Sequence, residues 1–283
     1  MIGETILVTG ASGKTGTALC ARLRGAGVSF RAGSRHNDGT AEYIPFDWDN
    51  EATHGPALEG ADRVYLVAPI GSPTPETVMV PFLHQALDAG VRRAVLLSSS
   101  AIPEGGPVLG QVHQAVRALM PEWTVLQPSW FMQNFTEGLH GGSIRAGGEI
   151  VTATGEGRVG FIDAGDIAEF AFRVLTDTAP DSGAHILTGP EALSYADAAA
   201  IIADAAGRPI RHRSLSPEAL RERLTVAGIP EGYASLLTSL DEAIQNGAED
   251  RVTTAVYAVT GRPPKSLAEF ARANARAWSL APE

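Results

Sequence analysis

The chain has 283 residues, of which 44% are hydrophobic and 19% are charged, and its formal net charge is -10 at pH 7. This balance is typical of a globular enzyme and excludes a disordered chain. The negative charge repels nucleic acid phosphates, and no Lys/Arg-rich block reverses it, so we expect no nucleic acid partner. Because no basic leader and no apolar stretch of membrane-spanning length is present, we expect a cytoplasmic protein that does not bind membranes.

Cysteine and histidine content argue against disulfide and metal chemistry. Cys20 is the only cysteine, and it stands among apolar residues of a predicted helix, so we expect it to pack in the core. The seven histidines are scattered singly, without the paired spacing typical of metal sites. We therefore predict no bound metal, and no pattern in the chain indicates an oligomeric state.

Short apolar runs alternate with helical patterns in the first half of the chain. Each run ends in glycine or small polar residues, and the spacing is that of βαβ units. Such alternation predicts an α/β fold with a Rossmann-type doubly wound parallel sheet, in which ligands bind beyond the carboxyl ends of the strands. We expect strands at 5–9, 28–34, 41–45, 64–68, 94–97 and 124–127, and helices ending near Gly25, at 76–89 and at 112–120.

The second half of the chain has a different pattern. Glycine pairs at 141–142 and 147–148 precede a hairpin-like stretch up to Phe161, and Asp166 begins a helix. Further helical patterns follow at 195–205, 217–227, 233–245 and 267–277. We therefore predict a Rossmann domain over 1–130 with a return segment at about 151–176, and a smaller, mostly helical lobe over 131–150 and 177–283.

A glycine-rich turn follows the first strand and opens the first helix. It reads TGASGKTG from Thr9 to Gly16. Its glycines permit a tight turn, a close approach of backbone amides to a pyrophosphate, and close packing of the helix on the sheet. A nucleoside-triphosphate P-loop has a similar ending, but it needs a glycine where this chain has Val8. We therefore predict a dinucleotide site that includes Gly10, Ser12, Gly13, Lys14, Thr15 and Gly16.

The residues at the end of the second strand indicate which dinucleotide is bound. NAD-preferring sites place Asp or Glu there, whereas this chain has Ser34 and Arg35. An arginine can fork onto a 2'-phosphate and a serine hydroxyl can donate to it, so we predict NADP(H) in preference to NAD(H). The alternative for Arg35 is a solvated surface charge. Asp47, after the third strand, either approaches the adenine or forms a turn.

With these motifs in view, the chain resembles the NmrA-like atypical short-chain dehydrogenases, and most closely the festuclavine and agroclavine dehydrogenase type. The resemblance rests on the glycine loop, Arg35, VAP at 67–69 and WTVLQPSWFMQNF at 123–135, and it extends into FIDAGDIA at 161–168, HILTGP at 185–190 and TGRPP at 260–264. It implies a Rossmann fold and NADPH at the glycine loop, with Ala68 and Pro69 in the cofactor site. Implied substrates are imines, iminium ions, quinones or conjugated carbonyls. Where relatives carry Leu-Arg-Pro, this chain has Gln127, which leaves that arginine without a counterpart.

The catalytic pair of ordinary short-chain dehydrogenases is missing. In a Tyr-x-x-x-Lys pair the lysine lowers the tyrosine pKa and anchors the nicotinamide ribose, while the tyrosine transfers a proton. The five tyrosines are instead followed four residues later by Asp47, Pro69, Ala199, Leu237 and Gly261. Hydride transfer to an iminium carbon requires no protonation of an alkoxide. The missing pair therefore favours reduction of C=N or activated C=C bonds over epimerisation of nucleotide sugars.

Other polar and aromatic residues lie where nicotinamide and substrate are expected. His113 stands near the place of the usual lysine, where it bonds the ribose or relays a proton; the alternative is a histidine on the helix surface. Ser98 and Ser99 end the fifth strand, where they contact cofactor or substrate, or satisfy backbone groups. We take His113 and Ser99 as catalytic candidates and Ser98 as a cofactor contact. The predicted substrate wall, for which core packing is the alternative, consists of Trp130, Phe131, Met132 and Asn134.

These observations leave three functions open. The first is an NADPH-dependent reductase that transfers hydride to a small organic substrate with a C=N, activated C=C or quinone group. The second is an NADP(H)-sensing regulatory protein without catalysis, with which the missing pair is also compatible. The third, a nucleotide-sugar epimerase, is disfavoured because it needs that pair. We predict the reductase, because the aromatic run at 129–135 indicates a ligand-sized pocket.

Overall fold

The computed structural model describes residues 4–179 and 182–278. Its internal contacts group the chain into two compact units. Unit 1 contains the chain up to Pro128 together with Ala164–Leu187 and Ala255–Arg262, and unit 2 contains Ser129–Asp163, Thr188–Thr254 and the chain from Pro263 onward. These boundaries differ from the predicted ones in three segments: residues 151–163 group with unit 2, and residues 177–187 and 255–262 group with unit 1.

Unit 1 is built on a seven-stranded parallel sheet in the order β3-β2-β1-β4-β5-β6-β9. All six strands predicted from the sequence are present, and their order confirms the Rossmann-type doubly wound fold. The unpredicted seventh strand, β9, pairs only with β6. The strands are β1 (Ile6–Val8), β2 (Phe30–Ser34), β3 (Tyr43–Pro45), β4 (Arg63–Leu66), β5 (Arg93–Leu97), β6 (Glu122–Pro128) and β9 (Gly183–Leu187).

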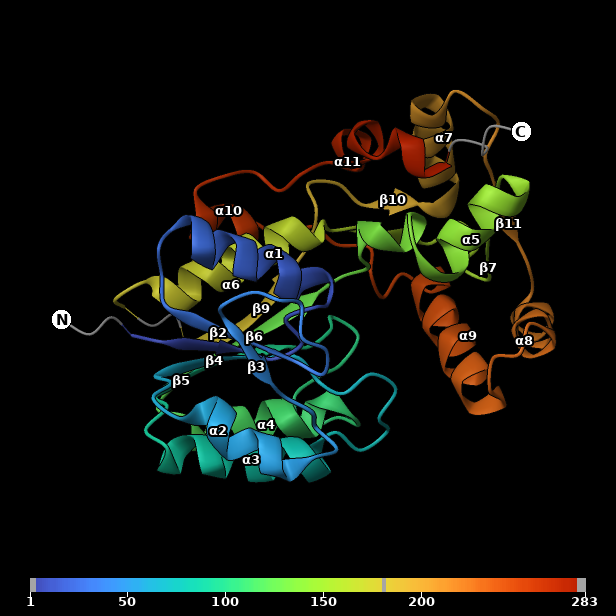
Figure 1. Ribbon diagram of the computed structural model, residues 1–283. Helices are drawn as coiled ribbons and strands as arrows, with labels where there is room; N and C mark the ends of the chain where they lie inside the picture. The colour runs from blue at the N-terminus through green and yellow to red at the C-terminus, as the bar shows by residue number, and fades with distance from the viewer. Residues whose placement is uncertain (1–3, 180–181, 279–283) are drawn as a thin grey trace. The chain divides into compact units, whose positions relative to one another are not determined.

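Helices cover both faces of this sheet, with α1 and α6 on one face and α2, α3 and α4 on the other (Figure 1). Each packs through one apolar stripe, as Phe170, Ala171 and Val174 do on α6. Cys20 of α1 is buried, as predicted, and burial raises the pKa of its thiol to about 11. The helices are α1 (Lys14–Gly25), α2 (His54–Leu58), α3 (Glu76–Asp88), α4 (Leu109–Leu119), α6 (Ala164–Thr176) and α10 (Ala255–Thr260), with a 3-10 turn η1 (Glu51–Thr53).

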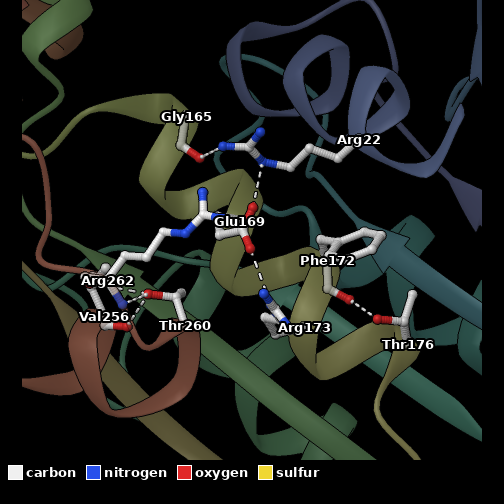
Figure 2. A network of polar contacts seen from close by, with 9 residues as sticks. All are labelled: Arg22, Gly165, Glu169, Phe172, Arg173, Thr176, Val256, Thr260 and Arg262. Atoms are coloured by element: carbon white, nitrogen blue, oxygen red, sulfur yellow. Dashed lines mark hydrogen bonds and ion pairs between the residues drawn. The ribbon is translucent and has the colours of Figure 1, made fainter. Parts of the chain in front are cut away.

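Polar contacts within unit 1 hold α6 against α1, although the two helices are far apart in sequence (Figure 2). Arg22 of α1 donates to the carbonyl oxygen of Gly165 over 3.0 Å, and its Nε lies 3.2 Å from Glu169 Oε2. Glu169 also pairs with Arg173, one turn further along α6, over 3.0 Å. Because the arginines are partly exposed, each pair contributes less than about 1 kcal/mol to stability. The pairs therefore contribute little to stability, and their main effect is to fix the position of α6 against α1.

Two buried arginines at the starts of neighbouring strands bind the carboxyl end of α6. Arg93 opens β5 and is 2% exposed, and Arg63 opens β4 and is 8% exposed. Their guanidinium groups donate to backbone carbonyls that have no partner inside the helix, and the positive charge complements the helix dipole. The acceptors are the carbonyl oxygens of Val174 and Asp177 for Arg93 and of Leu175 for Arg63.

Unit 2 combines helices with two small two-stranded sheets. β7 pairs in parallel with β11, and β8 pairs antiparallel with β10. The predicted hairpin up to Phe161 is therefore wrong, because β7 and β8 pair with later strands and not with each other. The elements are η2 (Met132–Phe135), α5 (Gly138–Gly147), β7 (Glu149–Thr152), β8 (Arg158–Val159), β10 (Leu193–Ser194), α7 (Tyr195–Ala206), β11 (Arg211–Ser214), α8 (Pro217–Val226), α9 (Glu231–Gln245), α11 (Leu267–Ala273) and η3 (Ala275–Trp278).

The helix α5 contains Gly141, Gly142 and Gly147, and Gly148 is its C-cap. A Cβ on Gly141 would lie 2.5 Å from the carbonyl carbon of Thr136, so glycine is needed for this close approach. Below α5 an aromatic core joins Phe135 to Tyr195, and the fully buried Trp278 donates its indole N–H to the carbonyl oxygen of Phe135 over 2.6 Å. Over the described residues, no helix is both long and apolar enough to cross a membrane.

Candidate functional site

The turn between β1 and α1 excludes side chains at two of its glycines. Gly10 has a φ of +63°, and a Cβ there would lie 2.9 Å from Val67 Cβ. A Cβ on Gly16 would lie 2.2 Å from the carbonyl oxygen of Gly10. Such distances are too short for real contacts, so alanine at either position would displace the turn. The fold of the turn itself therefore requires these two glycines.

The same turn leaves the amino end of α1 open to an anion. Gly13 is the N-cap and provides no side-chain hydrogen bond, so the first N–H groups of the helix have no partner within it. These N–H groups and the helix dipole favour a pyrophosphate. Ser12 and Lys14 are exposed on this loop. The Thr15 hydroxyl, in contrast, is buried and accepts a hydrogen bond from Tyr65 Oη over 3.0 Å, so only the backbone of Thr15 faces this end of the helix.

The end of β2 offers a free cation. Arg35 is exposed and makes no hydrogen bond or ion pair with any residue that the structure describes, and Ser34 before it is half-buried. Asp47 forms the turn that the sequence allowed, because its Oδ1 accepts the N–H of Asp49 over 3.2 Å. Ala68 and Pro69 are half-buried just beyond β4.

Ser98 has an unsatisfied hydroxyl at the carboxyl end of β5. The residue is 7% exposed, and among the described residues its Oγ has no hydrogen-bond partner. Leaving such a group buried and unpaired costs about 1–3 kcal/mol, so the position fits a ligand that bonds it. Ser99 differs, because its Oγ accepts the N–H of Ala101 over 3.3 Å and thereby satisfies a local backbone group.

His113 is not the surface residue that the sequence allowed. It lies on α4, is 3% exposed, and its ring packs 6.3 Å from that of Trp123 on β6. Burial lowers the pKa of His113, Glu104 opposes the shift and Arg117 adds to it, so the imidazole is neutral at pH 7. Trp123 pairs with Ala94 near the start of β5, whereas Ser98 follows the end of that strand, roughly 13 Å further along. The catalytic assignment of His113 and Ser99 stays a prediction.

Unit 2 encloses a cavity of about 820 Å³. This volume lies within the range of pockets that bind small organic molecules. Its walls are largely apolar and come from η2, α5, β7, α7, α8 and α9, with Trp130 just before η2. Two of the four predicted substrate residues, Trp130 and Asn134, line it.

The other two predicted wall residues lie elsewhere. Met132 is 1% exposed, packs in the aromatic core of unit 2 and does not line this cavity, so its assignment to the substrate wall stays a prediction without support from the cavity. Phe131 forms a parallel bridge with Ile162 and is not part of the cavity lining. The reason is the 3-10 turn η2, which sends successive side chains of this run in different directions.

Three titratable residues at the cavity were missed in the sequence. Burial raises the pKa of Asp241 to about 6, against the effect of the hydrogen bond from the Ala153 N–H. Burial, and then the charge of Asp241, raises the pKa of Tyr195 well above its usual value. Burial, and then His212, lowers the pKa of His140 to about 4. A signal for Asp241 exists: it is a lone carboxylate on the stripe of α9 that also carries Ala234, Thr238 and Ile244.

Neither of the two lysines of the chain stands four residues after a tyrosine, so neither forms a Tyr-x-x-x-Lys pair. Lys265 lies 3.1 Å from Asp163 in unit 2, and Lys14 begins α1 in unit 1. Asp163 is 4% exposed, and its carboxylate pairs with the partly exposed Lys265. No group of three potential metal ligands gathers within the described part of the chain.

Comparisons of sequence agree with this geometry. Residues 10–178 match the family described as NAD(P)H-binding. The uncharacterized oxidoreductase YesF of Bacillus subtilis is 49% identical over 276 residues, which cover 97% of this chain and 96% of YesF. Agroclavine dehydrogenase of Claviceps fusiformis is 38% identical over 286 residues, which cover 98% of this chain and 99% of that enzyme.

Solved structures share the fold at lower identity. The NADPH complex of the NADPH-dependent quinone oxidoreductase QOR2 from Escherichia coli has a TM-score of 0.80 and 22% identity, covering 94% of this chain and 98% of that one. NmrA, a negative transcriptional regulator crystallised with NAD, has a TM-score of 0.75 and 17% identity, covering 96% and 95%.

Proposed function

We propose that this oxidoreductase is an NADPH-dependent reductase of small organic substrates. The chain belongs to the NAD(P)H-binding family, and within it to the NmrA-like atypical short-chain dehydrogenases of the clavine dehydrogenase type. The substrates carry a C=N, activated C=C or quinone group. The observation that carries the proposal is the largely apolar 820 Å³ cavity of unit 2, in a chain that also has a dinucleotide-type glycine turn.

The residues of unit 1 fit a dinucleotide. The first-turn N–H groups of α1 hold the pyrophosphate, and the buried hydroxyl of Ser98 gains the hydrogen bond that it lacks within the described chain. Arg35 and Ser34 bind the 2'-phosphate, which gives the preference for NADPH over NADH. When bound, the reduced nicotinamide supplies the hydride.

The protein's own part in the chemistry is to bind and orient the substrate. Trp130 and Asn134 supply an aromatic face and an amide to the cavity wall. The chain has no Tyr-x-x-x-Lys pair to protonate an alkoxide; Tyr65 is buried against Thr15, and Lys265 pairs with Asp163. Substrates whose reduction needs no such proton, above all iminium ions, are therefore favoured.

The test follows the absorbance of reduced nicotinamide while the purified protein is mixed with NADPH and a panel of cyclic imines, iminium salts, quinones and conjugated enones. We expect turnover with at least one class. Tight NADPH binding without turnover on any compound would contradict the proposal and favour the NADP(H)-sensing alternative.

A further inference from the structure

The cavity of unit 2 has one acidic end, formed by a half-buried carboxylate. Asp241 of α9 lines it, and the hydrogen bond to its carboxylate within the described residues comes from the Ala153 N–H to Oδ2 over 2.8 Å. A carboxylate has about four acceptor positions, so most of its capacity faces the cavity unused. A carboxylate that is partly removed from water and has so few bonds is stabilised by a donor or a cation in the cavity.

A second residue at this cavity also lacks a partner. Tyr195 lines the cavity and is only 1% exposed, and its hydroxyl makes no hydrogen bond with any residue in 4–179 or 182–278. Its ring packs against those of Phe135 and His140, which fixes its orientation. Buried tyrosine hydroxyls normally find a partner, so the cavity provides two unused polar positions beside an aromatic surface.

The remaining charges of the lining do not offset Asp241. Glu149 of β7 lies 3.8 Å from Arg211 and 3.7 Å from Arg213, so its charge is shared with two cations. Glu137 and Arg223 also line the cavity, and both are exposed. Asp241 is therefore the charge that a buried ligand meets.

We propose that this cavity binds an organic cation, with an aromatic or alicyclic body and a protonated amine or iminium nitrogen, and that Asp241 is the residue that selects for the positive charge. The inference deepens the proposed function, on which it rests in taking the cavity as the substrate site. The nitrogen lies against the Asp241 carboxylate, the Tyr195 hydroxyl accepts a further hydrogen bond, and the Trp130 indole contacts the body of the ligand.

The charge of Asp241 makes cation binding depend on pH. Since its pKa is raised to about 6, the carboxylate is ionised above that pH and protonated below it, so cation affinity falls as the pH drops through 6. Three other titratable groups lie near it. His140 has a pKa of about 4 and is neutral, and the pKa of Tyr195 is raised well above 10. Burial lowers the pKa of His212 against the effect of Glu156, and the remaining charged residues of the lining are Glu137, Glu149 and Arg223.

The experiment compares a cation with its neutral analogue by titration calorimetry on the full chain, without NADPH. The probes are naphthylmethylammonium and naphthylmethanol. At about pH 8 we expect Asp241→Asn to weaken binding of the cation about 10- to 100-fold and to leave the neutral alcohol unchanged. The amide oxygen of asparagine can still accept the Ala153 N–H, so the fold is retained. Glu242→Gln, the neighbouring exposed residue of α9, removes the same charge outside the cavity and serves as the matched control.

Equal affinity of the wild-type protein for both probes would overturn the inference, as would an equal effect of the two variants. Titration of the wild-type protein from about pH 8 to about pH 5 is an independent test that needs no variant. Cation affinity that does not fall over this range would contradict the role of Asp241. If the proposed reductase function is wrong but this inference is right, NADPH is not oxidised while the protein still binds the cation selectively.

Discussion

Replacing Arg35 by alanine should weaken NADPH binding about 10- to 100-fold and leave NADH binding unchanged. Arg35 is exposed and makes no hydrogen bond or ion pair with another described residue, so its loss costs the free protein almost no stability. One forked, charge-assisted contact to a 2'-phosphate is worth about 1.5–3 kcal/mol, and each 1.4 kcal/mol is a factor of ten in the dissociation constant. NADH has no 2'-phosphate and so loses nothing.

The assay is titration of each reduced cofactor, followed by nicotinamide fluorescence, for wild type and variant. Arg92→Ala is the matched control, because Arg92 is exposed and precedes the amino end of β5, whereas Arg35 follows the carboxyl end of β2 in the same parallel sheet. The control should bind both cofactors as the wild type does. An equal loss for NADPH and NADH in Arg35→Ala, or no loss for either, would refute the assignment of the 2'-phosphate site.

Three further substitutions test the turn, the unpaired hydroxyl and the core. Gly16→Ala places a methyl group 2.2 Å from the Gly10 carbonyl and should lower the free energy of unfolding by about 1–3 kcal/mol and abolish NADPH binding, whereas Gly25→Ala, with open space around it, should do neither. Ser98→Ala should leave or raise the Tm of the free protein and weaken NADPH binding; a lower Tm would mean that the hydroxyl is already bonded. Trp278→Phe leaves a buried carbonyl without its donor and should cost about 1–3 kcal/mol in urea unfolding; an unchanged midpoint would exclude that role.

The features that the sequence predicts correctly are those set by local chemistry. The six strands and the glycine turn depend on short apolar runs and on residues such as Gly10 and Gly16, whose need for space is visible in the chain itself. Cys20 is buried because its neighbours on α1 are apolar. The family resemblance rests on the same local motifs, and the fold that it implies is the one observed.

The features that it does not predict depend on contacts between distant segments. The partners of β7 and β8 lie 34 or more residues away along the chain, so local turn signals suggested a hairpin instead. Met132 and Trp130 are two residues apart in one apolar run, yet one packs in the core and the other lines the cavity. Asp241 reads as an ordinary helix carboxylate until the chain folds around it.

The most direct test of the central claim uses NADPH carrying deuterium at C4 of the nicotinamide, on one face or the other, with the imines, iminium salts and enones of the same panel, because their reduced carbon keeps the transferred deuterium whereas the hydroxyl groups of a hydroquinone exchange it with water. The account predicts a reduced product that contains one deuterium from only one of the two labelled cofactors, because the bound substrate meets one face of the nicotinamide. Recovery of every compound unreduced, with NADPH bound, would contradict it.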